Sequence, residues 1–199
     1  MRIILASASA SRTRLLREAH IPHEIEVSGV DEESEGFTAL PPAQMVLALA
    51  EAKAQAVALR HANESGLVIG ADSTLEFQGS CMAKPEQAEV AINWWRDYSG
   101  QSGSLHTGQA VIDLNTKRKV CALSTTQITF ARIGEEEIRS YVATGEPLML
   151  AGGASLDGIG APYISHINGD ATGVLGISMN VLRELVEELG HPWHTLRAS

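Results

Sequence analysis

The sequence predicts an α/β fold in which helices flank a mixed, twisted β-sheet. Short apolar runs that suit buried strands alternate along the chain with longer segments of helical spacing, the order expected of an α/β protein. Of the 199 residues, 44% are hydrophobic and 20% are charged, so the chain can bury a substantial core. We expect one domain, residues 1–199, built as two lobes around a cleft, although the sequence does not mark their boundary.

The first half of the chain begins with a strand, a serine-rich turn and a helix. Residues 2–6 (RIILA) form a short run that is apolar after Arg2, the turn 7–11 follows, and Leu15 and Leu16 then have helical spacing. Farther on, Pro41 and Pro42 open an alanine-rich segment typical of a long helix. The elements expected in this half are strands at 2–6, 23–28 and 67–72, and helices at 12–19 and from Pro42 to about His61.

The second half continues the alternation and then becomes rich in glycine. Asn115-Thr116 is the expected turn between two strands, and Gly190 followed by Pro192 ends the last helix. Residues 151–160 contain four glycines and show no helical period. The elements expected in this half are helices at 84–98, 135–142 and 180–189, and strands near 106–114, 119–130 and 162–167.

Charge and composition exclude several classes of protein. The net charge of −9 argues against a polynucleotide partner, because phosphate backbones are bound through basic patches. There is no run of about 18 apolar residues to span a membrane, and the serine-interrupted start is not a signal peptide. Cys81 and Cys121 form neither a disulfide framework nor a zinc motif, so we expect a reducing, cytoplasmic location.

The first group with chemical potential lies where the first strand meets the first helix. Ser7, Ser9, Ser11 and Arg12 place three hydroxyls and a guanidinium at a helix N-terminus, where free N–H groups and the helix dipole attract anions. The alternative is that one serine only caps the helix while the arginine is solvated. Taken alone, this motif favours the alternative.

A lysine stands in the middle of an apolar stripe on the long helix. At about 100° per residue, Lys53 shares a side with Val46, Leu49 and Val57. A lysine there needs either an anion or a route to water for its ammonium group. Because Lys53 is central in the helix, ligand contact is favoured slightly over snorkelling.

A carboxylate and a second lysine follow at the expected ends of elements. Asp72 ends the run 67–72, and α/β sheets bind their ligands at the carboxyl ends of strands. A simple Asx-turn explains Asp72 about as well. Lys84 comes twelve residues later, directly before Pro85, and is a weak signal by itself.

Two further segments have features of a ligand site: one offers oxygen atoms to a metal, and the other lets a ligand come close to the backbone. The pair Asp31-Glu32 is either a solvated acidic surface or a source of oxygen ligands for Mg²⁺ or Mn²⁺. The stretch 151–160 allows a ligand to approach the backbone, and Asp157-Gly158 within it is alternatively a hairpin turn. Neither a P-loop nor a dinucleotide-binding fingerprint is present. Together with the basic residues, these groups resemble a site for phosphate and metal.

Nine segments in order give the chain a specific family resemblance. The sequence resembles the Maf-type nucleoside triphosphate pyrophosphatases over about residues 3 to 190. The matching segments are LASASASRTRLL (5–16), VDE (30–32), LAEAKAQAV (49–57), VIGADST (68–74), AKP (83–85), YSG (98–100) with HTG (106–108), TGEP (144–147), AGGASLDGIGAP (151–162), and INGD (167–170) with VLGIS (174–178).

This resemblance implies a fold, a reaction and a set of site residues. It implies a two-lobed α/β fold similar to the inosine triphosphatase type, a homodimer, and hydrolysis of a nucleoside triphosphate to the monophosphate and pyrophosphate with Mg²⁺, Mn²⁺ or Co²⁺. The family's catalytic aspartate falls on Asp72, which would accept a proton from water, and an acidic position near the metal falls on Glu32. The phosphate-binding positions fall on Ser7, Ser9, Arg12, Lys53 and Lys84, and those that sort base preference on Ser11, Ser73 and Asp157.

Departures from the family pattern leave two questions open. One branch of the family is active on dTTP and UTP, and another is active on 7-methyl-GTP. Ser11 and Asp157 differ from the residues of both branches, so neither base preference transfers to this chain. A modified nucleotide therefore stays open as the substrate. Ala10, Gly103, Leu150 and Ala154 also replace usual residues. A non-catalytic nucleotide-sensing regulator of cell division, using the same pocket, is therefore the alternative function. An aspartyl-nucleophile phosphatase is disfavoured because Thr74 stands where a second aspartate is required.

Overall fold

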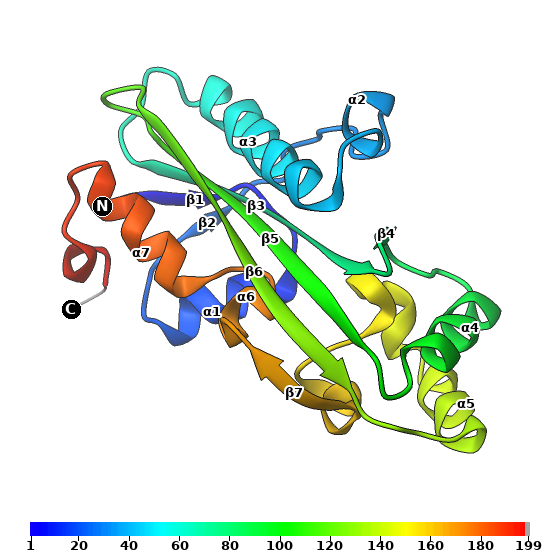
Figure 1. The fold of residues 1–199 in the computed structure, drawn as a ribbon. Helices are drawn as coiled ribbons and strands as arrows, with labels where there is room; N and C mark the ends of the chain where they lie inside the picture. The colour runs from blue at the N-terminus through cyan, green and yellow to red at the C-terminus, as the bar shows by residue number, and fades with distance from the viewer. Residues whose placement is uncertain (198–199) are drawn as a thin grey trace.

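The α/β prediction is confirmed by a computed structural model, which describes residues 1–197. Within these residues the strands form one mixed seven-stranded sheet in the order β2-β1-β3-β5-β6-β7, with β4 paired to β3 (Figure 1). β1 pairs in parallel with β2 and β3, and the remaining pairs are antiparallel. The strands are β1 Ile3–Leu5, β2 Glu24–Ile25, β3 Leu67–Phe77, β4 Ser80–Met82, β5 Ser102–Asp113, β6 Lys119–Phe130 and β7 Ile164–Asn168.

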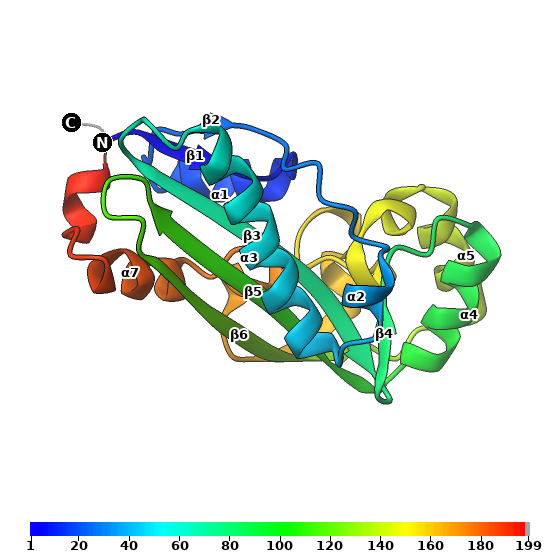
Figure 2. The same cartoon turned by 90° about the horizontal axis from the view of Figure 1, so that it is seen from above.

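Helices cover both faces of the sheet. α3 crosses β3 and β5 on one face, α1, α6 and α7 lie on the other, and α4 and α5 pack together at one end of the long strands (Figures 1 and 2). None of the helices within residues 1–197 combines the length and apolar character needed to cross a bilayer. The α-helices are α1 Ala10–Glu18, α2 Glu35–Thr38, α3 Pro42–Arg60, α4 Ala88–Tyr98, α5 Glu135–Ala143, α6 Ala171–Val174 and α7 Met179–Glu188, and the 3-10 helices are η1 Glu146–Met149, η2 Ala151–Gly153, η3 Gly158–Tyr163 and η4 Trp193–Leu196.

Two large hydrophobic cores lie at opposite ends of the long strands. One packs the sheet against α1 and α7 through aliphatic side chains such as Leu16 and Leu182. The other is aromatic and is centred on Trp95, whose ring meets Tyr98, Phe130 and Tyr141 edge to face. Because β3, β5 and β6 contribute to both cores, the two ends of the molecule belong to one continuous sheet.

The helix α3 lies unusually close to the sheet beneath it. A Cβ atom at Gly70 of β3 would lie 2.2 Å from the Ala50 carbonyl oxygen, and one at Gly108 of β5 would lie 2.3 Å from the Val46 oxygen. Both glycines are therefore required for the contact, and the small alanines of α3 fit against them. This close approach sets the height of α3 above the sheet.

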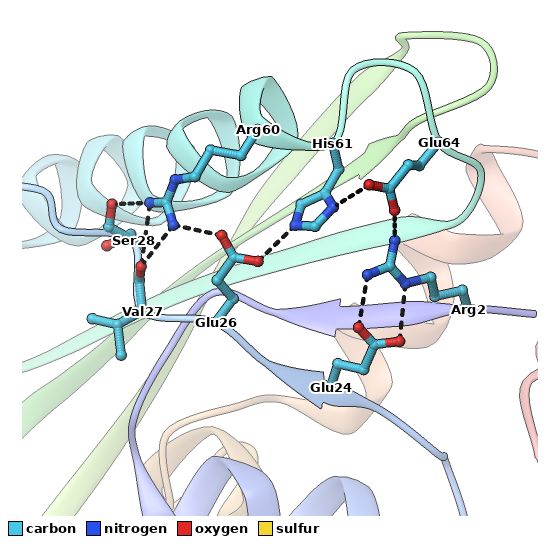
Figure 3. Close-up of polar contacts among 8 residues, drawn as sticks. All are labelled: Arg2, Glu24, Glu26, Val27, Ser28, Arg60, His61 and Glu64. Carbon is cyan, nitrogen blue, oxygen red and sulfur yellow. Dashed lines mark hydrogen bonds and ion pairs between the residues drawn. The ribbon is translucent and has the colours of Figure 1, made fainter.

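A network of charged side chains ties the C-terminal end of α3 to β1 and β2 (Figure 3). Arg60 donates to the carbonyl oxygens of Val27 and Ser28 and pairs with Glu26, so it does not simply extend into water. His61 bridges Glu26 and Glu64. Arg2 pairs with Glu24 and Glu64. The network therefore fixes the direction in which α3 leaves the edge of the sheet.

β3 is longer than the sequence predicts, and this corrects the expected setting of Asp72. β3 pairs with β5 from Leu67 to Glu76, so Asp72 lies inside the strand and does not end it. The neighbouring β1 stops at Leu5, which pairs with Ile69. β3 therefore loses its parallel partner just before Asp72, and an open edge of the sheet lies beside it.

The helix expected from Lys84 starts later. Glu86 has a left-handed φ of +55°, and Gln87 is an extended N-cap, so α4 begins at Ala88. Pro85 is buried in the loop that precedes the helix. The glycine-rich stretch forms short 3-10 turns, and Asp157 is the N-cap of η3, not part of a hairpin turn.

Candidate active site

Lys53 links two carboxylates on the face of the sheet covered by α3. Its ammonium nitrogen lies 2.7 Å from Asp72 Oδ1 and 2.8 Å from Glu32 Oε1. The side chains of Lys53 and Asp72 are only 7% and 12% exposed, whereas that of Glu32 is 50% exposed. A buried lysine is thus neutralised by one buried and one half-exposed acid, as the apolar stripe around Lys53 requires.

Arg12 occupies the opposite face of the same strand. Successive side chains of a strand point to opposite faces, so Asp72 faces α3 and Ser73 faces α1. The buried guanidinium of Arg12 donates to Ser73 Oγ at 3.2 Å, to Ser7 Oγ at 3.0 Å and to the Gly176 carbonyl at 2.8 Å. The guanidinium is therefore held in one orientation beside the open edge of β3.

The serines before α1 form its N-terminal cap. Ser9 is the N-cap, and its hydroxyl accepts a hydrogen bond from the Arg12 amide. The Ser7 hydroxyl accepts one from the Ser9 amide and one from Arg12. Capping is thus observed, but other amides of the first turn still point toward the end of the helix, where anions bind favourably. Ser11 is part-buried in this turn.

Burial and charge act against each other at Asp72. Burial raises the pKa of Asp72 above its ordinary value, while the charges of Lys53 and Arg12 lower it by less. Burial likewise lowers the pKa of Arg12, against the attraction of Asp72 and Glu32. An acid with a raised pKa beside fixed cations is an environment typical of a general base.

Comparison with known proteins identifies the family of this chain. A model of the family described as Maf-like protein matches residues 2–189. The chain belongs to the Maf family. A relative from Streptomyces coelicolor, named nucleoside triphosphate pyrophosphatase, is 46% identical over 189 residues, which are 95% of this chain and 91% of the relative. One from Synechococcus elongatus, with the same name, is 42% identical and covers 98% of both chains.

A solved structure shares the fold of this Maf protein. The Ham1 protein of Staphylococcus aureus superposes with a TM-score of 0.51 at 14% sequence identity, covering 95% of this chain and 100% of that one. At this identity the likeness concerns the fold alone. It confirms the type of fold that the family resemblance implies.

Two of the predicted site residues lie apart from the Lys53–Asp72 pair. Lys84 is exposed in the loop before α4, and within residues 1–197 its side chain makes no hydrogen bond or ion pair. Asp157 forms an ion pair with Arg14 of α1 and a hydrogen bond with Ser155. The structure thus gathers Ser7, Ser9, Arg12, Glu32, Lys53, Asp72 and Ser73, whereas Lys84 and Asp157 lie on the surrounding loops.

Sequence reasoning missed two side chains of this Maf protein. Thr107 donates its hydroxyl hydrogen to the Gly173 carbonyl at 2.8 Å and therefore accepts a hydrogen bond from Ser73 at 2.9 Å, which leaves Ser73 Oγ to accept from Arg12. Thr107 belongs to the segment HTG (106–108), which is one of the nine segments that resemble the family. The resemblance therefore marked this position but assigned no function to Thr107. No role in the site was predicted for Arg14, and nothing in the helical pattern indicates its partner Asp157.

The acidic side chains suit a metal shared with a substrate. Among residues 1–197, no group of three or more His, Cys, Asp or Glu side chains is arranged to hold an ion by itself. The oxygens available are those of Glu32 and Asp72, both close to Lys53. Mg²⁺ commonly takes one or two carboxylates and completes its shell with waters and substrate phosphates, so this donor set fits such an ion.

Proposed function

We propose that this chain hydrolyses a nucleoside triphosphate between its α- and β-phosphates, releasing the monophosphate and pyrophosphate. The observation that carries the proposal is the buried Lys53–Asp72 pair, with the guanidinium of Arg12 on the other face of the same strand. The names of the relatives in Streptomyces coelicolor and Synechococcus elongatus support the same reaction.

Each residue has a physical role in this reaction. Asp72, with its raised pKa, accepts a proton from the water that attacks the α-phosphorus. Lys53 and Arg12 neutralise the charge that develops on the phosphate oxygens, since phosphoryl transfer depends mainly on positioning and electrostatics. Ser7 and Ser9 present the helix N-terminus to the phosphates, and Lys84 extends to them from its loop. Ser11, Ser73 and Asp157 contribute to recognition of the nucleoside.

A divalent cation completes the proposed site. Glu32 and Asp72 would hold Mg²⁺, Mn²⁺ or Co²⁺ together with oxygens of the triphosphate, and the ion would supply charge neutralisation there. Lys53 keeps both carboxylates in place without the ion. We therefore expect a chelator to abolish hydrolysis without lowering the melting temperature.

The proposal is tested by assaying pyrophosphate release on a panel of canonical and modified nucleotides with Mn²⁺ or Mg²⁺. The reaction run in ¹⁸O-labelled water should place the label in the monophosphate, because water attacks the α-phosphorus. Label in pyrophosphate would contradict attack on the α-phosphorus, and release of inorganic phosphate alone would contradict cleavage between the α- and β-phosphates.

The same panel separates the enzyme from a nucleotide-sensing regulator. Such a regulator would bind a nucleotide, as measured by calorimetry, without releasing pyrophosphate on any member of the panel. The homodimer and the cytoplasmic location remain predictions from the resemblance and the cysteine content. Sedimentation equilibrium tests the dimer, which would have twice the chain mass of 21.2 kDa.

A further inference from the structure

Residues 151–163, which we call the glycine-rich strap, are firmly held by the aromatic end of the molecule. Trp95 Nε1 donates to the Gly153 carbonyl at 2.9 Å. Glu146 accepts hydrogen bonds from the amides of Ile159 and Gly160 at 2.9 and 2.8 Å. These contacts make the strap part of the lobe formed by α4 and α5.

On its other side the strap meets α1 through one polar contact. Arg14 pairs with Asp157, and Ser155 hydrogen-bonds the second oxygen of the same carboxylate. Within residues 1–197 no other hydrogen bond or ion pair joins Ala10–Glu18 to the strap. Burial raises the pKa of Asp157, but Ser155 and Arg14 lower it by more, so this carboxylate is ionised at neutral pH.

The two attachment points lie within three residues of candidate-site residues along the chain. At one of them Gly152 packs so closely on Leu75 of β3 that a Cβ would lie 2.5 Å from the Leu75 Cβ. At the other, Arg14 is two residues from Arg12 on α1. The strap therefore extends from β3 to α1 on the face of β3 that carries Ser73 and Arg12, whereas Asp72 and Lys53 lie on the other face of the strand.

The Arg14–Asp157 pair is too exposed to be explained by stability. Its side chains are 44% and 36% exposed, and ion pairs in such positions contribute little to folding. A weak contact that is the single polar link between two firmly held parts can nevertheless shift an opening equilibrium by several-fold.

We propose that Arg14 is a positioning residue whose ion pair with Asp157 fastens the glycine-rich strap to α1 over the bound nucleotide. This inference rests on the proposed function, because it places the nucleotide at the open edge of β3, between the strap on one face and the Lys53–Asp72 pair on the other. When the pair breaks, the strap opens and the nucleotide dissociates faster, while the reacting groups around Asp72 are unchanged. The KM should therefore rise without a fall in kcat.

The test compares four variants with the wild type under the same ionic conditions. R14Q should raise KM about twofold to fivefold, equally for every accepted nucleotide, with kcat unchanged within twofold. D157N should raise KM at least as much, because Asp157 also contributes to recognition of the nucleoside. The charge swap R14D/D157R should restore the attachment of the strap to α1, which hydrogen exchange measures. R183Q is the matched control, because Arg183 forms an equally exposed pair with Glu187 inside α7 alone.

Hydrogen exchange gives a readout that does not depend on activity. Amides of 151–163 should exchange about twofold to fivefold faster in R14Q than in wild type or R183Q. Unchanged exchange in R14Q, an R14Q effect on KM confined to one base, or strap amides that exchange as fast in R14D/D157R as in R14Q would overturn the inference. If the wild type releases no pyrophosphate, the proposed function fails, while the exchange experiment still decides whether Arg14 fastens the strap.

Discussion

At the scale of single residues, Asp72 is an acid whose environment differs strongly from water. It is buried beside a lysine, and burial outweighs the nearby cations so that its pKa is raised. Between the ordinary pKa and the raised one, the folded chain binds more protons than the unfolded chain. Ionised Asp72 therefore costs stability as pH rises through this interval, a cost that is typical of a functional group.

The raised pKa of Asp72 makes a prediction for the protein without metal. Burial keeps the pKa above 3.8, the ordinary value of an aspartate, so the carboxyl should titrate above 3.8 in the metal-free protein. Carbon-13 NMR of the Asp72 carboxyl as pH is lowered, with D72N to assign the signal, measures this titration. A midpoint at or below 3.8 would show that burial does not outweigh the cations around Asp72.

The two predicted lysines should respond differently to substitution. K53M leaves Asp72 buried without its partner, so we expect a loss of about 3 kcal/mol of unfolding free energy and about 100-fold or more in kcat. K84M removes an exposed cation, and we expect roughly a 30-fold loss in kcat/KM with an unchanged melting temperature. Urea unfolding and steady-state kinetics measure both effects.

K119M serves as the control for both lysine variants, because Lys119 pairs with Glu51 at an exposed position on another surface. It should leave kinetics and unfolding close to wild type. If K84M behaves like this control, the role predicted for Lys84 is wrong.

At the scale of elements, the site depends on how closely α3 lies on the sheet. Gly70 and Gly108 allow the helix backbone to touch the strands, and Lys53 thereby reaches Asp72. The helix and its buried stripe were predictable from the spacing of Val46, Leu49 and Val57. The two glycines were not recognised as packing positions, because a glycine within a strand shows no period by itself.

Moving α3 away from the sheet should impair the reaction without touching a catalytic group. In G108A the new methyl group would lie 2.3 Å from the Val46 oxygen, so α3 must shift. We expect a loss of about 2 kcal/mol in stability and about tenfold to 100-fold in kcat. Chemical denaturation and steady-state kinetics measure the two losses.

G36A is the comparison, because a Cβ at Gly36 of α2 meets nothing within 4 Å. It should retain wild-type kinetics. Full activity in G108A would show that the distance between α3 and the sheet does not position Lys53.

At the scale of the whole molecule, alternation of elements was enough to predict the fold class, and the structure confirms β6 at Lys119–Phe130 as expected. The end of β3 was predicted too early in the sequence. The second half of the strand, DSTLEF (72–77), has polar side chains on one face, so it lacks the continuous apolar run from which the strand was predicted. The sequence also separates Arg12 from Ser73 by 61 positions, and their contact depends on tertiary packing. Asp157 and Arg14 meet for the same reason, across 143 positions.

Replacing Asp72 by asparagine is the most direct measurement of the proposed mechanism. D72N keeps the shape of the side chain and leaves Glu32 to neutralise Lys53, so the melting temperature at neutral pH should equal or exceed that of the wild type. Removing a general base should lower kcat for pyrophosphate release by about 10²- to 10⁴-fold. A folded D72N variant that keeps kcat within tenfold of the wild type would contradict the role of Asp72 and the reaction built around it.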